Sequence, residues 1–188
     1  MSLPRGVSLH ATEEDKIRHE AGHVILHWLI GNTPISVQYI DNGLITHLEQ
    51  KRNLTEQPWQ HIMSLLAGPV AEGNDEVLSE LRCAYEYILN CNNQFFVEGS
   101  DSFRIYDHLA KINRLILAAG EAATRDILDE CRDLQEDFIV RFKKNNGLTQ
   151  TEIQNMFIHW DNVKKWTEEE KKELLKRKFE EKRGLTPY

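Results

Sequence analysis

The chain has 188 residues, of which 40% are apolar, enough material for one compact domain with a hydrophobic core. Its formal net charge of −7 argues against a nucleic-acid-binding protein, because such proteins neutralise phosphates with a basic face. The sequence contains neither the roughly 20 consecutive apolar residues of a membrane helix nor the apolar middle of a signal peptide. We therefore expect a cytoplasmic protein without a membrane span, in which Cys83, Cys91 and Cys131 are reduced.

The first predicted helix runs from Thr12 to Ile30. Thr12 is suited to cap its start, acidic residues follow in the first turn, and Gly31 is suited to end it. Apolar side chains recur at helical spacing and form a broad face, so we expect this helix to be packed: Ile17, Ala21, Val24, Ile25, Trp28 and Leu29.

A β-hairpin is predicted next. Residues 35–40 and 44–48 have strand-like composition, and the Asn42-Gly43 pair between them favours a tight turn. Beyond this hairpin the spacing of apolar residues is helical, which predicts a mainly α fold with one small antiparallel sheet. The predicted helices span residues 58–73, 75–91, 101–119, 121–144 and 149–160.

The C-terminal part of the chain has two recognisable features. Thr149 and Glu152 have the spacing of a capping box at the start of a helix. Residues 167–183 are dense in Glu, Lys and Arg, with only Leu174, Leu175 and Phe179 to bury, which predicts a solvated terminal helix; a docking element is the alternative. We accordingly expect a helical domain over residues 1–160 and a charged C-terminal helix or tail over residues 161–188.

Residues 19–23 read HEAGH, an H-E-x-x-H pattern inside the first predicted helix. Side chains four residues apart project from the same helix face, so His19 and His23 can direct two imidazole nitrogens at one tetrahedral zinc ion. Glu20 is placed to take a proton from the attacking water and pass it to the leaving amine. The pattern predicts a zinc site with Glu20 as the general acid and base of peptide hydrolysis.

The third zinc ligand is expected elsewhere in the chain. His27 lies about 12 Å along the helix axis from His19, at 1.5 Å per residue, which is too far to share one tetrahedral ion. We expect His27 to have a packing or supporting role. Leu26 stands where peptidases with H-E-x-x-H-x-x-G-x-x-H carry glycine, which excludes that class.

Three segments resemble the peptidase domain of the FtsH-type ATP-dependent zinc metalloproteases. Residues 19–29, HEAGHVILHWL, are similar to the metal-binding helix of that family. Residues 64–72, SLLAGPVAE, resemble a helix with a small-residue pair that lies beside it. Residues 99–103, GSDSF, resemble the segment that supplies an aspartate to the metal. The resemblance spans roughly residues 12 to 160 and implies a zincin-like helical domain with a small hairpin after the metal helix.

Carried over residue by residue, the resemblance implies that His19, His23 and Asp101 are the zinc ligands. The family often shows Asn-Asp where this chain has a single aspartate, so Asp107 or Glu98 are alternatives to Asp101. Glu72 is either an exposed carboxylate or a group that orients a ligand histidine.

These observations predict a zinc-dependent endopeptidase that acts on polypeptides. The sequence has no G-x-x-x-x-G-K-[ST] loop, so we expect cleavage of accessible segments without an ATP-driven unfolding module. The alternative is an adaptor or regulatory binding module that keeps the fold without catalysis. A purely structural helical protein without metal is the third hypothesis. Substrate identity and oligomeric state stay open.

Overall fold

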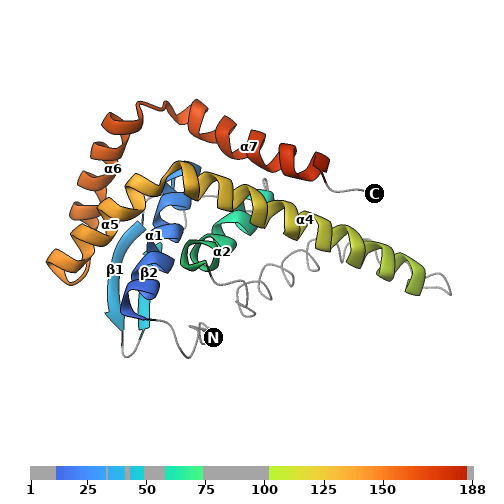
Figure 1. Cartoon of the computed structure of the whole chain (residues 1–188), viewed down its shortest axis with the longest axis horizontal. Helices are drawn as coiled ribbons and strands as arrows, with labels where there is room; N and C mark the ends of the chain where they lie inside the picture. Colours follow the sequence, from blue (N-terminus) through green and yellow to red (C-terminus); the bar gives the residue numbers. More distant parts are fainter. Residues whose placement is uncertain (1–11, 33, 41–42, 49–57, 74–101, 186–188) are drawn as a thin grey trace.

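A computed structural model describes residues 12–32, 34–40, 43–48, 58–73 and 102–185 of the chain (Figure 1). These ranges form a mainly α-helical protein with a two-stranded antiparallel sheet, as the sequence predicts. None of the described helices is both long and apolar enough to span a bilayer. The elements are α1 (Glu13–Ile30), β1 (Pro34–Ile40), β2 (Gly43–Leu48), α2 (Pro58–Glu72), α4 (Ser102–Glu130), α5 (Arg132–Asn145), α6 (Gln150–Lys164) and α7 (Glu168–Leu185).

Both ends of α1 match the prediction. Asp15 N donates to Thr12 Oγ1 at 3.2 Å, and Thr12 N donates to the Asp15 carboxylate at 2.8 Å, which forms a reciprocal capping box. Hydrogen bonds from Thr12 lower the pKa of the Asp15 carboxyl. At the other end Gly31 adopts a left-handed conformation with φ 83°, where a residue without Cβ is favoured.

The predicted hairpin is confirmed, although its turn at residues 41–42 lies outside the described ranges. β1 and β2 pair antiparallel from Pro34 opposite Leu48 to Ile40 opposite Gly43. The outer edge of β1 makes a further bridge to the connection between α5 and α6, because Val37 and Leu148 exchange backbone hydrogen bonds of 2.9 and 2.8 Å. The sheet is thereby fixed between α1 and the α5–α6 connection.

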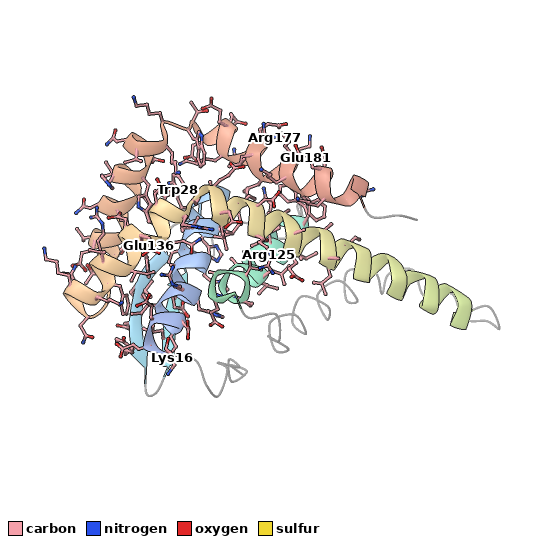
Figure 2. The ribbon with its side chains drawn as sticks, in the orientation of Figure 1. Lys16, Trp28, Arg125, Glu136, Arg177 and Glu181 are labelled. Atoms are coloured by element: carbon pink, nitrogen blue, oxygen red, sulfur yellow. The ribbon has the colours of Figure 1, made fainter. Side chains whose placement is uncertain are left out.

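The hydrophobic core surrounds α1. Figure 1 shows α1 with α2 and α4 to one side and α5 and the hairpin to the other. Trp28, labelled in Figure 2 at the end of α1 opposite Lys16, contacts the rings of Trp160 and Trp166. The metal-binding motif predicted from the sequence therefore lies on a helix whose described side chains are mostly buried.

One predicted helix boundary is wrong. The break expected near residue 120 does not occur, because α4 continues to Glu130 and the chain interrupts its helix at Cys131 instead. Gly120 lies inside α4 facing α2, where an added Cβ would come within 3.1 Å of Ile62 Cγ2. This glycine permits close helix packing and does not end the helix. The helix predicted over residues 75–91 lies outside the described ranges.

The prediction of a solvated C-terminal helix is wrong for one face of α7. Leu174, Leu175 and Phe179 are buried in the same core as the residues of α1, and the predicted domain boundary at residue 160 falls inside α6. Lys171 of α7 is also buried, with its ammonium 2.6 Å from Asp161 and 4.4 Å from the centre of the Trp28 ring. Residues 161–185 are therefore part of the packed domain.

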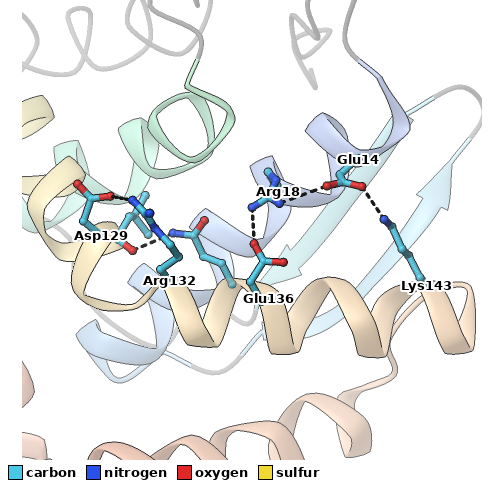
Figure 3. Close-up of polar contacts among 8 residues, drawn as sticks. Glu14, Arg18, Asp129, Arg132, Glu136 and Lys143 are labelled. Atoms are coloured by element: carbon cyan, nitrogen blue, oxygen red, sulfur yellow. Dashed lines mark hydrogen bonds and ion pairs between the residues drawn. The ribbon is translucent and has the colours of Figure 1, made fainter.

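Ion pairs join the exposed side of α1 to α5 (Figure 3). Arg18 contacts Glu136 at 2.8 Å and Glu14 at 3.2 Å, and Glu14 in turn contacts Lys143 at 2.7 Å. Hydrogen bonds from Lys143 and then Arg18 lower the pKa of the Glu14 carboxyl. Because these groups are largely solvated, the pairs define how α1 and α5 align more than they stabilise the fold.

Candidate metal centre

Small residues bring α1 and α2 into contact at the predicted site. A Cβ added at Gly22 would lie 2.2 Å from the carbonyl oxygen of Ala67 and 2.8 Å from Cβ of Ala71. Only glycine allows this approach, because the atom that it would meet is backbone. The Gly22 of the HEAGH pattern thus sets the distance at which α2 faces the two histidines.

The structure brings His19 and His23 together as the sequence predicts. Their Nε2 atoms lie 3.1 Å apart, and their rings meet edge to face with centroids 4.8 Å apart. A tetrahedral zinc ion bound at about 2.0–2.1 Å to both nitrogens would subtend an N–Zn–N angle of about 100° at this separation. The two nitrogens are therefore spaced as a pair of ligands to one ion.

The other ring nitrogens of both histidines are held by residues of α2. Nδ1 of His23 is 2.8 Å from the backbone carbonyl oxygen of Ser64. Since a carbonyl can only accept, this nitrogen must carry a hydrogen. Nδ1 of His19 is 2.6 Å from the buried carboxylate of Glu72, which accepts from it when ionised. Of the two alternatives for Glu72, the structure supports the one in which it orients a histidine.

When Glu72 is ionised and accepts from His19 Nδ1, this hydrogen bonding leaves a lone pair on Nε2 of each neutral ring. Two lone pairs at 3.1 Å repel unless a cation lies between or beside them, either a shared proton or a metal ion. In metal sites, ligand histidines commonly donate their second N–H to a carboxylate or a backbone carbonyl. The donor set of His19 and His23 therefore fits zinc.

Gly68 of α2 lies against the two histidines. A Cβ built at this position would be 2.4 Å from Nε2 and 2.5 Å from Cδ2 of His19, and 2.5 Å from Nε2 of His23. A side chain at this position would therefore collide with both imidazole rings. Glycine at position 68 thus allows the two rings to lie together with their Nε2 atoms 3.1 Å apart.

Glu20, between the two histidines in sequence, is buried on the side of α1 that faces the hairpin. Only 3% of its surface is exposed. The hydroxyl of Thr46, which is itself buried on β2, donates a hydrogen bond to Oε2 of Glu20. One carboxylate oxygen of the predicted general base, Oε2, is therefore hydrogen-bonded to the sheet.

The described residues supply two of the predicted ligands. Asp101 and its alternative Glu98 lie outside the described ranges. The other alternative, Asp107, lies in α4, but the structure does not describe its side chain. Among the side chains that are described, no group of three or more His, Cys, Asp or Glu could hold a metal ion. The third ligand stays a prediction.

His27 occupies the position expected for a packing residue. It is buried one turn beyond His23, and its Nδ1 is 3.4 Å from Nδ2 of Asn32, the residue that follows the helix cap. The backbone N–H of Asn32 also donates to the carbonyl of His27 at 2.8 Å. These contacts join His27 to Asn32, just beyond the end of α1.

Sequence reasoning missed the contribution of Thr46 and the carbonyl of Ser64. Thr46 is 26 positions from Glu20, and Ser64 is 41 positions from His23, so no helical or strand spacing connects them. The only local signal was the alternation of β2, which places Thr46 and Leu44 on the buried face of the hairpin.

Comparison with protein-family models and with characterised proteins finds no match to this chain. What supports a function is therefore the geometry of the site together with the three segments, residues 19–29, 64–72 and 99–103, that resemble the FtsH-type peptidase domain.

Proposed function

We propose that this chain is a zinc-dependent endopeptidase with an FtsH-peptidase-like, zincin-like domain. In this proposal His19 and His23 hold zinc together with Asp101, and Glu20 is the general acid and base. The observation that carries the proposal is that the Nε2 atoms of His19 and His23 lie 3.1 Å apart against Gly68, while residues of α2 accept hydrogen bonds from both Nδ1 atoms. A merely structural histidine pair does not require all of these features together.

The metal supplies Lewis acidity when bound: it polarises a substrate carbonyl and makes a water molecule easier to deprotonate. The protein residues orient the ligands and move the proton. Glu72 and Ser64 fix the tautomer and the direction of the two imidazoles. Glu20 accepts a proton at Oε1 as the water attacks and returns it to the nitrogen of the leaving amine.

A polypeptide is the substrate class that fits this machinery best. One carboxylate beside a His-His metal pair supplies both the base for the water and the acid for the amine, and amide hydrolysis requires both steps. No ATP-binding loop occurs in the sequence, so the proposed substrates are segments already accessible in the target protein.

The substitution Glu20→Gln tests the catalytic half of the proposal. It keeps the size of the side chain and a partner for Thr46 but removes the proton-accepting oxygen, so zinc should stay bound while cleavage of fluorescein-labelled casein falls by at least about 100-fold. Glu14→Gln, on the exposed face of the same helix, is the matched control and should cleave casein at the wild-type rate. Casein cleavage by Glu20→Gln at the wild-type rate would refute the mechanism.

A further inference from the structure

We infer that Thr46 of β2 is a positioning residue for Glu20, an inference that rests on the proposed function. Glu20 and Thr46 come from different elements, and each buries at least nine-tenths of its surface. Their hydrogen bond joins the Thr46 hydroxyl to Oε2 of the carboxylate. The hairpin thereby participates in the site through the side chain of Thr46.

This contact limits the orientations of the carboxylate. A glutamate side chain has several rotamers, and its terminal torsion is broad, so a carboxylate without a partner samples many directions. Fixing Oε2 to a strand directs Oε1 consistently relative to the imidazoles of the same helix. Because a misplacement of about 1 Å in a reacting group can lower a rate by about 100-fold, this restraint should matter for kcat.

The contact also joins the base to the sheet that follows the metal helix. β1 is bridged to Leu148 on its outer side, and β2 is the strand that contacts α1 more closely. A shift of β2 therefore moves Thr46 and, through it, Glu20. Thr46 restrains the base and does not touch the reacting atoms, so its loss should lower kcat and leave KM and zinc content unchanged.

The test compares Thr46→Val, Thr46→Ser and Thr124→Val with the wild type and Glu20→Gln. Valine has nearly the shape of threonine but no hydroxyl, whereas serine keeps the hydroxyl. Thr124 is the matched control, because it is also buried and donates to the carbonyl of Gly120 within α4, a helix that carries neither Glu20 nor a histidine of the pair. The assays are kcat and KM on one internally quenched casein-derived peptide, zinc per chain, melting temperature, and the crystal structure of Thr46→Val.

We expect Thr46→Val to lose about 10- to 100-fold in kcat with zinc content and KM unchanged, and its Glu20 carboxylate to turn from the position seen here. Thr46→Ser should recover most of that loss, and Thr124→Val should retain wild-type kcat. If Glu20→Gln is inactive but Thr46→Val equals the wild type, the role of Thr46 is overturned and the proposed function stands. If Glu20→Gln cleaves as fast as the wild type, or the wild type does not cleave, the proposed function is overturned and the role of Thr46 with it.

Discussion

Replacing Gly68 by alanine tests whether zinc binding depends on the observed arrangement of the two histidine rings. The added Cβ would lie 2.4 and 2.5 Å from the two Nε2 atoms, so the rings must retreat by roughly 1 Å to reach ordinary van der Waals distance. Neither ring can do so freely, because the Nδ1 atoms are already 2.6 and 2.8 Å from Glu72 and Ser64.

The expected cost divides into two parts. Overpacking of this kind destabilises by about 1–3 kcal/mol, and the higher helix propensity of alanine offsets about 1 kcal/mol, so the metal-free variant should stay folded with at most about 2 kcal/mol lost. Zinc at about 100 times its Kd stabilises the wild type by about 2.7 kcal/mol, and Gly68→Ala should lose this increment as well.

The assay is urea unfolding of each protein in zinc and in chelator. Gly120→Ala is the control, since its Cβ would meet Ile62, Leu66 and Phe179, at 3.1, 3.4 and 4.0 Å, and neither histidine is among these contacts. It should keep the zinc increment. If Gly68→Ala were stabilised by zinc as strongly as the wild type, zinc binding by the two histidines in this arrangement would be contradicted.

Two further predictions concern the fold that holds the site. Lys171→Ala should destabilise the protein by about 3 kcal/mol, because it removes a buried side chain packed on Trp28 and the ammonium beside Asp161. Lys171→Met keeps the packing on Trp28 and should destabilise the protein by about 1 kcal/mol, since Asp161 is half-exposed and stays hydrated. Equal unfolding midpoints in urea for the two Lys171 variants would contradict the larger effect assigned to packing on Trp28. Hydrogen bonds from the backbone and side chain of Thr149 lower the pKa of the Glu152 carboxyl in the folded protein. The ionised carboxylate therefore stabilises the fold above its unfolded-state pKa, and this stabilisation is lost as pH falls through the folded-state pKa. The melting temperature of Glu152→Gln should therefore fall less than that of the wild type between about pH 5 and pH 3, and parallel declines would refute the capping contribution.

Local signals predicted the elements that carry the site. The capping residue Thr12 and the terminal Gly31 located both ends of α1, and the Asn42-Gly43 pair between two strand-like runs located the hairpin. These features depend on hydrogen bonds within a few residues, so the sequence contains them directly. The break placed near Gly120 was wrong because a glycine in a helix also serves packing, and only the position of α2 distinguishes the two uses.

The arrangement around the motif was less accessible from the sequence. The i, i+4 spacing predicted that His19 and His23 converge, and it left the role of Glu72 undecided because this residue is 53 positions from His19. The sequence did not predict the burial of α7, because Leu174, Leu175 and Phe179 stand among many charged residues. The packing of Lys171 on Trp28, a contact between distant parts of the chain, shows that this face of the helix is buried. Contacts of this kind arise from tertiary packing, which periodicity does not report.

The zinc content of the purified protein tests the central claim most directly. Elemental analysis of protein prepared in zinc-replete medium should give near one zinc per wild-type chain, and His19→Ala and Asp101→Ala should lose it. The exposed His159 of α6 provides the matched control, because His159→Ala removes an imidazole away from the site and should retain the metal. Wild-type protein without zinc under these conditions, or His19→Ala with a full complement of zinc, would contradict the account.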